Sequence, residues 1–265
     1  MEPWILVTND DSVESPALPP LLSALGGLAS VRTVVPAREA SWSSKILSRF
    51  AQLRLTPVSQ LGQEAYTLEG SPADCANVGI HHLTPEPPQL VVSGINIGEN
   101  AGLAFLLSSG TVGAAIEASL SGVPAAAFSV KLSPASYEGW YRNRDPEPLA
   151  TVWERAAIIA TEITAEILSG GLPEGARLVS VNIPEEADAG TPRVLTRVTD
   201  TSYGSFFRRA EDGLLVHHYS GYRWTKASAK GDAEVLEAGA VSISPLRLQL
   251  DTTPTAADRS RFERA

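Results

Sequence analysis

Hydrophobic positions in the first 185 residues fall into short apolar runs that alternate with longer segments of helical periodicity. The apolar and β-branched runs predict strands at residues 5–8, 31–35, 90–93, 125–130 and 178–183. The periodic segments predict helices at residues 16–28, 112–120 and 148–168. Strands that alternate with helices form parallel βαβ units. The pattern therefore predicts an α/β protein, a Rossmann-like three-layer sandwich with a mostly parallel sheet.

Some segments between these elements have a different pattern. Residues 52–57 and 65–68 predict the strands of a side ribbon, and residues 131–147 predict a polar connector. The run Ser71-Pro72-Ala73-Asp74 is typical of a helix start, with serine as the cap and proline at the first helical position. We therefore assign Asp74 to helix capping rather than to catalysis.

The pattern changes after about residue 185. Residues 193–199, 213–219 and 239–250 contain alternating or β-branched runs separated by Gly, Asp and Ser, which is typical of hairpins. We expect a C-terminal antiparallel β-hairpin extension that serves as an oligomerisation arm. The predicted organisation is a core at residues 1–185, the extension at residues 186–251 and a polar tail at residues 252–265.

Charge and cysteine content narrow the class of function. The 265 residues carry a formal net charge of −9, which argues against binding to duplex nucleic acid because that needs a basic surface. Cys75 is the only cysteine, so a disulfide within the chain and a cysteine zinc cluster are excluded, and we expect a buried thiol. No signal peptide is recognisable, and no apolar run approaches the ~20 residues of a membrane span. We expect a cytoplasmic protein without membrane contacts.

The clearest candidate for chemistry is Asn9-Asp10-Asp11, which follows the first predicted strand. Ligands of α/β proteins bind at the carboxyl ends of parallel strands. Two adjacent carboxylates repel each other there unless a cation or a shared proton compensates, and oxygen ligands of this kind suit Mg²⁺ or Mn²⁺. The same residues are also typical of a solvated turn, so this segment alone leaves both interpretations open.

Three further segments are expected at the same edge of the sheet. Residues 36–44 place serine hydroxyls after the second strand, and residues 93–102 combine glycine with asparagine after the third. The run Ser108-Ser109-Gly110-Thr111 precedes a helix, whose first N–H groups and positive dipole end form a natural phosphate cradle. Each segment taken alone is also compatible with an ordinary loop or helix cap.

Other catalytic arrangements have less support. The adjacent pairs His81-His82 and His217-His218 have side chains that diverge in a helix or a strand, so we expect packing or surface roles. The sequence has neither a Walker loop with its lysine nor a G-x-S-x-G elbow.

Together these motifs resemble the SurE family of stationary-phase survival proteins, which are metal-dependent nucleotidases. The resemblance runs from Ile5 to about Val130, with weaker matches at residues 179–184 and 239–246. The matching pieces follow the family's order at compatible spacing. They are Val7-Thr8-Asn9-Asp10-Asp11, Ser15-Pro16, Gly70-Ser71-Pro72-Ala73-Asp74-Cys75, Ser93-Gly94-Ile95-Asn96 with Gly98, Asn100 and Gly102, and Ser109-Gly110-Thr111-Val112-Gly113-Ala114-Ala115.

The resemblance implies hydrolysis of nucleoside 5′- and 3′-monophosphates to nucleoside and phosphate, with one divalent cation, Mg²⁺ or Mn²⁺. It places the metal ligands at Asp10, Asp11, Ser41 and Asn96, the two aspartates also being catalytic, and the substrate-phosphate contacts at Asn9, Ser109, Gly110 and Thr111. Ser41 is chosen because it lies five residues after Pro36, as the family's spacing requires. Family members assemble through a C-terminal extension, so a homodimer or homotetramer is expected.

The chain departs from the family at several positions. Ser12 and Trp42 stand where the family usually has glycine, and Ser108 stands where it usually has an aromatic residue. Residues 46–48 replace a Ser-x-Thr motif, and residues 103–107 lack the carboxylates common there. Two alternatives to a nucleotidase follow: a divergent member that binds nucleotide or metal with weak or no turnover, and a non-catalytic oligomerising scaffold.

Overall fold

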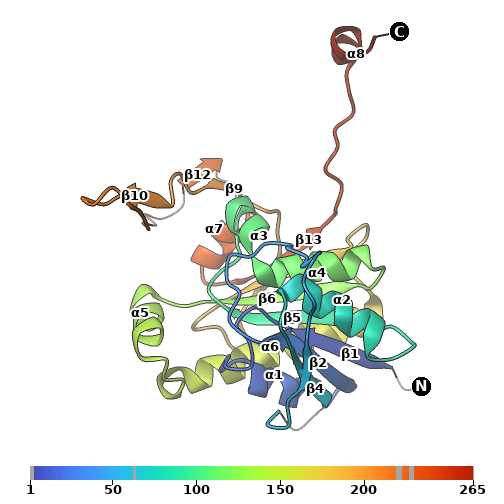
Figure 1. The fold of residues 1–265 in the computed structure, drawn as a ribbon, viewed down its shortest axis with the longest axis vertical. Coiled ribbons are helices and arrows are strands. Elements are labelled where there is room, and N and C mark those ends of the chain that lie inside the picture. Colours follow the sequence, from blue (N-terminus) through green and yellow to red (C-terminus); the bar gives the residue numbers. More distant parts are fainter. Residues whose placement is uncertain (1–2, 62–63, 219–222, 227–229, 265) are drawn as a thin grey trace.

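A mixed β-sheet forms the centre of the protein in the computed structural model, which describes residues 3–61, 64–218, 223–226 and 230–264 (Figure 1). Within these residues the strand order of the nine-stranded sheet is β3-β4-β2-β1-β5-β6-β7-β13-β8. Its strands are β1 (Trp4–Thr8), β2 (Ser30–Pro36), β3 (Leu55–Pro57), β4 (Glu64–Leu68), β5 (Leu90–Ile97), β6 (Ala125–Lys131), β7 (Leu178–Pro184), β8 (Arg193–Leu195) and β13 (Val241–Leu246). Strands β4, β2, β1, β5, β6 and β7 run parallel, whereas β3 and β13 run antiparallel to β4 and β7. The predicted α/β fold with a mostly parallel sheet is confirmed.

Helices cover both faces of this sheet (Figure 1). The helices of the described residues are α1 (Leu18–Leu25), α2 (Pro72–His82), α3 (Leu103–Ser108), α4 (Gly110–Leu120), α5 (Pro134–Asn143), a 3₁₀ turn at Glu147–Leu149, α6 (Ala150–Gly170), α7 (Asp232–Glu237) and α8 (Ala256–Phe262), of which α8 lies away from the sheet. Among the described helices, none is long and apolar enough to cross a lipid bilayer.

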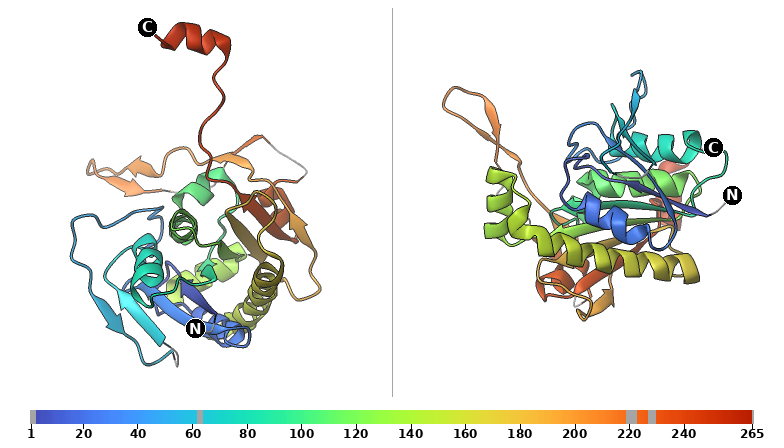
Figure 2. Two further views of the ribbon diagram at one scale, coloured as in Figure 1. Left: turned by 90° about the vertical axis from the view of Figure 1, so that its right-hand side faces the viewer. Right: turned by 90° about the horizontal axis from the view of Figure 1, so that it is seen from below.

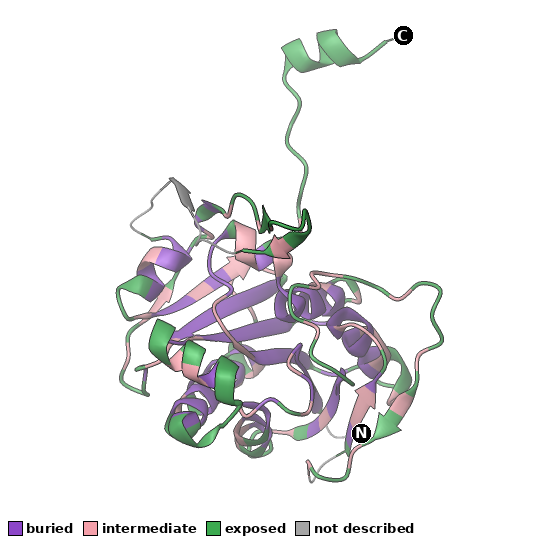
Figure 3. Cartoon of the chain, turned by 60° about the vertical axis from the view of Figure 1, so that its left-hand side comes forward, coloured by how far each residue is buried: buried purple, intermediate pink, exposed green. Residues whose placement is uncertain are grey.

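The two faces of β1 show how the layers are built. Ile5 and Val7 belong to the buried cluster that also contains the apolar residues of α1 and α6. Leu6, between them, belongs to the cluster that contains those of α2 and α4. Successive side chains of a strand point to opposite faces, so a strand covered on both sides is apolar throughout. Figure 3 shows the resulting buried sheet between its helices.

Helix α2 begins as the sequence predicts. The Ser71 hydroxyl accepts a hydrogen bond from the Asp74 N–H (3.1 Å), and the Asp74 carboxylate accepts one from the Ser71 N–H (2.8 Å). Its other oxygen accepts the N–H of Ser48 (3.0 Å), in the loop between β2 and β3. Partial burial raises the pKa of Asp74, but the hydrogen bonds from Ser48 and Ser71 outweigh burial and the pKa is lowered. The predicted capping role is confirmed.

Two segments differ from the sequence prediction. Residues 131–147, predicted as a connector, contain α5, which Ser133 caps and Pro134 begins. The buried residue of α5 is Trp140, so the helix lacks the apolar stripe by which periodicity detects a helix. The predicted side ribbon exists as the antiparallel pair β3–β4, but β4 also pairs in parallel with β2. The ribbon is therefore the edge of the main sheet.

Beyond residue 185 the chain both leaves the central sheet and returns to it. Strands β8 and β13 belong to the sheet. Between them lie β9 (Asp200–Ser202), β10 (Phe207–Arg209), β11 (Leu215–His217) and β12 (Arg223–Lys226). These form the antiparallel pairs β9–β12 and β10–β11, which extend from the body (Figures 1 and 2). The predicted antiparallel extension is present, and the division at residue 185 stays a prediction. Figure 1 also shows α8 at the end of an extended segment, away from the body.

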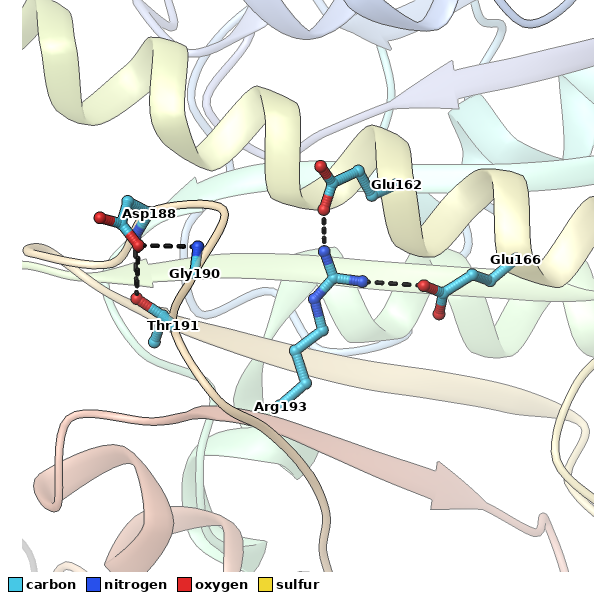
Figure 4. Close-up of polar contacts among 6 residues, drawn as sticks. All are labelled: Glu162, Glu166, Asp188, Gly190, Thr191 and Arg193. Carbon is cyan, nitrogen blue, oxygen red and sulfur yellow. Dashed lines mark hydrogen bonds and ion pairs between the residues drawn. The ribbon is translucent and has the colours of Figure 1, made fainter.

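Arg193 links β8, the edge strand of the sheet, to α6 (Figure 4). Its guanidinium donates hydrogen bonds to Glu166 (2.9 Å) and to Glu162, both on α6. Asp188 closes the turn before β8 by accepting the Gly190 N–H (2.8 Å). The edge strand β8 is thereby tied to the helical layer as well as to β13.

Asp74→Ala is expected to lower the free energy of unfolding by about 1–2 kcal/mol, because the N–H groups of Ser71 and Ser48 both lose the carboxylate that accepts their hydrogen bonds. For a chain of this size, the melting temperature should fall by about 3–6 °C in scanning calorimetry. Asp258→Ala is the matched control, since Asp258 forms the same capping box on α8, a helix without buried residues. Its melting temperature should stay within about 1 °C of the wild type. An equal fall in melting temperature in the two variants would contradict the stabilising role assigned to Asp74.

Candidate functional site

The predicted site residues Asp10 and Asp11 lie just beyond the carboxyl end of β1, which is flanked by β2 and β5. The Asp10 carbonyl accepts the N–H of Ala40, in the loop after β2 (2.8 Å). The Asp11 carboxylate accepts the N–H of Ile97, at the end of β5 (3.2 Å). The Asp10 carboxylate accepts the hydroxyl of Thr111, in the first turn of α4 (2.8 Å). Segments far apart in the sequence therefore meet around the aspartate pair.

Helix α4 approaches Asp10 closely because its first residue is glycine. A Cβ atom on Gly110 would lie 3.0 Å from Asp10 Oδ2 and 2.8 Å from Ser43 Oγ. The Asp10 side chain sits against this helix end with 3% of the residue exposed. The partial positive charge of a helix N-terminus stabilises a carboxylate in this place. A larger residue at position 110 would push the helix away from the aspartate.

The loop after β2 lies against the same helix. The Ser44 N–H donates to the Ser108 carbonyl (3.0 Å), and the Ser44 hydroxyl donates to the Leu107 carbonyl (2.7 Å). Gly113 makes room for the contact, since a Cβ atom there would lie 2.1 Å from the Ser44 carbonyl oxygen. Residues 41–44 are therefore held over the start of α4.

Burial and mutual repulsion oppose ionisation of the aspartate pair. Burial raises the pKa of Asp10 to about 6, although the hydrogen bond from Thr111 opposes the shift. Burial, followed by the charge of Asp10, raises the pKa of Asp11 well above its ordinary value, against the Ile97 N–H and the positive charge of Arg144. A divalent cation would stabilise both ionised carboxylates. The electrostatics of the pair therefore fit a cation held by oxygen ligands.

The other two predicted ligands lie on segments that adjoin the pair. Asn96 is inside β5 rather than in the loop after it, and its amide donates to the Gly98 carbonyl (2.5 Å). The Ser41 hydroxyl donates to Glu39 (2.8 Å) at an exposed position. Within the described residues, neither side chain is hydrogen-bonded to Asp10 or Asp11. The convergence of all four on one cation stays a prediction.

The predicted phosphate cradle is the N-terminus of α4. The Ser109 hydroxyl accepts the Val112 N–H (3.1 Å), so it acts as the helix cap. The Thr111 hydroxyl is directed to Asp10 instead of outward. The sequence analysis predicted that Ser109 and Thr111 contact the substrate phosphate. In the structure, both hydroxyls already form hydrogen bonds within the protein. The backbone N–H groups of the first turn are the remaining phosphate donors at this helix end.

Two buried polar atoms at the site have no hydrogen-bond partner in the described part of the chain. They are the amide oxygen of Asn9, whose amide nitrogen donates to the Ser12 carbonyl (2.8 Å), and the hydroxyl of Ser43. Buried polar atoms are rarely left unpaired in native proteins, and exceptions mark sites for water, ions or ligands. Both atoms lie on segments that adjoin Asp10, which supports a ligand site there.

Sequence reasoning missed charged and aromatic residues beside the pair. Arg144 forms an ion pair with Glu39 (3.4 Å) and acts on Asp11 electrostatically. Tyr137 on α5 has a pKa raised by burial and by the electrostatic influence of Tyr141, Glu39 and Asp11, against the positive charge of Arg144. Helix α5 thus borders the site, although its segment was predicted as a connector. The run Ala37-Arg38-Glu39, directly after β2, was the signal for Glu39.

The two residues that stand where the family usually has glycine, Ser12 and Trp42, share one backbone property. Ser12 has φ 67° and Trp42 has φ 60°, both in the left-handed region of backbone space. Glycine adopts this conformation freely, whereas other residues are strained there. The family's usual glycines therefore correspond to real backbone requirements in this chain. Trp42 adopts the left-handed conformation although it carries a large ring, and it lies next to Ser41 in the chain.

The remaining candidates have structural roles. Cys75 is fully buried, and burial raises the pKa of its thiol. His81 contacts the Ser121 hydroxyl (3.3 Å), and His217 stacks on Phe206. The described residues contain no group of three or more His, Cys, Asp or Glu side chains able to hold a metal. A cation at the aspartate pair would therefore take neutral oxygen ligands as well.

Comparison with known proteins gives a consistent assignment. A family model described as "Survival protein SurE" matches residues 5–205. A protein named 5′-nucleotidase SurE from Methanoculleus marisnigri is 33% identical over 260 residues, which is 97% of this chain and 96% of the relative. Another of that name from Pelobacter propionicus is 37% identical over 250 residues, with 93% and 94% covered. The crystal structure of the SurE protein from Aquifex aeolicus superposes with a TM-score of 0.76 and 28% identity, covering 98% of this chain and 97% of the other.

Asp10→Asn is expected to stabilise the metal-free protein at pH 7.5. The amide oxygen still accepts the Thr111 hydroxyl, while a carboxylate whose ionisation is opposed by burial is replaced by a neutral group. Because the pKa of Asp10 is raised by folding, the native state binds more protons than the unfolded state between about pH 4 and 6, and stability falls as pH rises through that window. With EDTA present, the melting temperature should rise by about 3 °C or more at pH 7.5 and by less at pH 4.5.

Asp251→Asn is the control for this measurement, because Asp251 is an exposed aspartate in the C-terminal segment. Its melting temperature should not change at either pH. A lower melting temperature for Asp10→Asn at pH 7.5 would show that the Asp10 carboxylate is not the destabilising charge.

Proposed function

This chain belongs to the SurE family, and we propose that it is a divalent-metal-dependent phosphomonoesterase that hydrolyses nucleoside 5′-monophosphates, and 3′-monophosphates as a second class, to nucleoside and phosphate. The observation that carries the proposal is the adjacent pair Asp10 and Asp11 just beyond the carboxyl end of a parallel strand, where Asp10 is buried against the N-terminus of α4 and Asp11 is partly buried. Relatives named 5′-nucleotidase SurE match nearly the whole chain, which supports the substrate class.

The residues at the site fit a hard cation. Asp10, Asp11, Ser41 and Asn96 would hold Mg²⁺ or Mn²⁺ with two carboxylate oxygens, a hydroxyl and an amide oxygen. The raised pKa values of the two aspartates mark a place where positive charge is favoured. When bound, the cation supplies Lewis acidity toward the phosphoryl group and lowers the pKa of water.

The protein's own groups bind and orient the substrate. The first N–H groups of α4, from Gly110 and Thr111, face a phosphate at the helix end, where the dipole stabilises its developing charge. The unpaired amide oxygen of Asn9 is an acceptor for a protonated phosphate oxygen or a bound water. Thr111 fixes the Asp10 carboxylate through its hydroxyl, so Asp10 is the better placed of the two aspartates to accept a proton from the attacking water.

One observation favours a second candidate, a nucleotide- or metal-binding protein with weak turnover. Ser12, which follows the aspartate pair, and Trp42, in the loop after β2, both occupy left-handed backbone. If this conformation places Ser41 poorly, ligands bind without fast hydrolysis. Phosphate release from AMP and GMP separates the candidates: turnover supports the enzyme, whereas ligand-induced thermal stabilisation without turnover supports the binding protein.

Purified protein is expected to release phosphate from AMP and GMP with Mn²⁺ or Mg²⁺ and to lose this activity with EDTA. Asp10→Asn should lower kcat/KM by about 100-fold or more, because both a metal ligand and the proton acceptor are lost. Asp251→Asn is the control and should retain wild-type activity. Full EDTA-resistant activity in Asp10→Asn would refute the proposed mechanism.

We also propose that the chain forms a homodimer or homotetramer through the β10–β11 ribbon, where Phe207, Leu214 and Leu215 are exposed. Exposed apolar side chains on a projecting ribbon are typical of a contact surface. Replacing both leucines by serine should shift the assembly toward monomer in analytical ultracentrifugation. Leu250→Ser, at an exposed position in the tail, should leave the assembly unchanged. A monomeric wild-type protein would contradict this proposal.

A further inference from the structure

Four aromatic side chains form a cluster beside the aspartate pair, which we call the aromatic platform: Trp42, Phe105, Tyr203 and Phe206. Trp42 comes from the loop after β2, Phe105 from α3, and the other two from the extension after β9. The ring centroid of Trp42 lies 5.6 Å from that of Phe105, 6.2 Å from that of Tyr203 and 5.0 Å from that of Phe206. Rings at these distances attract one another, so the platform is a packed unit.

The arrangement of the rings leaves Trp42 able to stack. Its three neighbours meet it at interplanar angles of 56°, 79° and 71°, so each contacts the indole at a steep angle. None of these described rings lies parallel to it. Half of the Trp42 surface is exposed to solvent. The indole is therefore held by one tilted and two T-shaped ring contacts, while half of its surface is exposed and accessible to an aromatic ligand.

The platform is linked to the predicted phosphate site through two of its members, Trp42 and Tyr203. Trp42 lies between Ser41, a predicted metal ligand, and Ser43, whose hydroxyl is near the start of α4. The Tyr203 hydroxyl contacts the Ser108 hydroxyl (3.0 Å), one residue before the cap of α4. A phosphate at the N-terminus of α4 would thus have an aromatic surface within reach of the group it carries. The ring faces of the platform suit a flat, uncharged aromatic group.

We propose that Trp42 stacks on the nucleobase of the substrate and makes this enzyme selective for nucleotides over phosphomonoesters without a base. The inference rests on the proposed nucleotidase function and deepens it, by assigning base recognition to a residue that stands in place of the family's usual glycine. With glycine at this position, the loop would contribute no ring to the site. Phe105, Tyr203 and Phe206 position the indole.

A purely structural role for Trp42 makes a different prediction. As an anchor between the loop and the extension, Trp42 would affect every phosphomonoester alike, since the loop carries Ser41. As a stacking residue, it affects only substrates that carry a base. Comparing AMP with ribose 5-phosphate, which has the same 5′-phosphate but no base, separates the two roles.

The experiment measures kcat/KM for AMP and for ribose 5-phosphate in the wild type and in Trp42→Ala, Trp42→Phe and Phe50→Ala. Trp42→Ala should lower kcat/KM for AMP by about tenfold, the loss expected for one base–aromatic stack, and change it by less than about twofold for ribose 5-phosphate. Trp42→Phe keeps a ring and should recover most of the loss. Phe50→Ala is the matched control, an exposed aromatic of the same loop outside the platform, and should behave as wild type.

Binding of adenosine gives a second readout that does not depend on turnover. Adenosine should quench tryptophan fluorescence in the wild type, and the quenching should be lost in Trp42→Phe. An equal fall in kcat/KM for AMP and ribose 5-phosphate in Trp42→Ala would overturn the stacking role of Trp42. Fluorescence quenching by adenosine that persists in Trp42→Phe would overturn it too. If neither substrate is hydrolysed by the wild type, the proposed function fails, and the adenosine titration alone supports or overturns stacking.

Discussion

The site depends on the placement of two carboxylates next to each other, with Asp10 buried and Asp11 partly buried. Such a pair is unfavourable unless its surroundings are organised around it. The structure provides partners from two neighbouring elements: α4, which begins with glycine, contributes a hydroxyl and its helix dipole, and the end of β5 contributes a backbone N–H. The order of β2, β1 and β5 in the sheet brings these partners together. The fold therefore concentrates negative charge beyond the carboxyl end of β1, the place that we propose for a cation and the substrate phosphate.

Much of the core could be predicted from the sequence, because β1, β2, β5, β6 and β7 are apolar runs between periodic helices. Asp74 was also predictable, since Ser-Pro-x-Asp is local chemistry that tertiary structure does not change. Helix α5 was not, because it buries Trp140 alone and offers no periodic stripe. Asn96 was expected in a loop, yet β5 continues through Ile97 to pair with β6. Continued strand pairing of this kind depends on neighbours that are distant in the sequence.

The site itself was predicted as a set of residues but not as a set of contacts. The aspartate pair and the start of α4 were identified, and the structure joins them through Thr111 and Asp10. The direction of the Thr111 hydroxyl could not be read from the sequence, because it depends on how closely α4 approaches β1. The same holds for Glu39 and Arg144, whose pairing requires α5 to lie near the loop after β2. Motif spacing identifies candidate atoms, and packing decides which partner each atom takes.

The place of β13 in the sheet has a consequence for how the protein is made. This strand lies between β7 and β8, and it forms only after the ribosome has synthesised the whole extension. Until then a nascent chain presents the edge of β7, with unpaired backbone groups that can pair with other chains. The sheet is complete only when the segment that leaves the body at β9 has returned as β13. Fragments that end before residue 241 are therefore expected to aggregate rather than to fold as shorter versions of the enzyme.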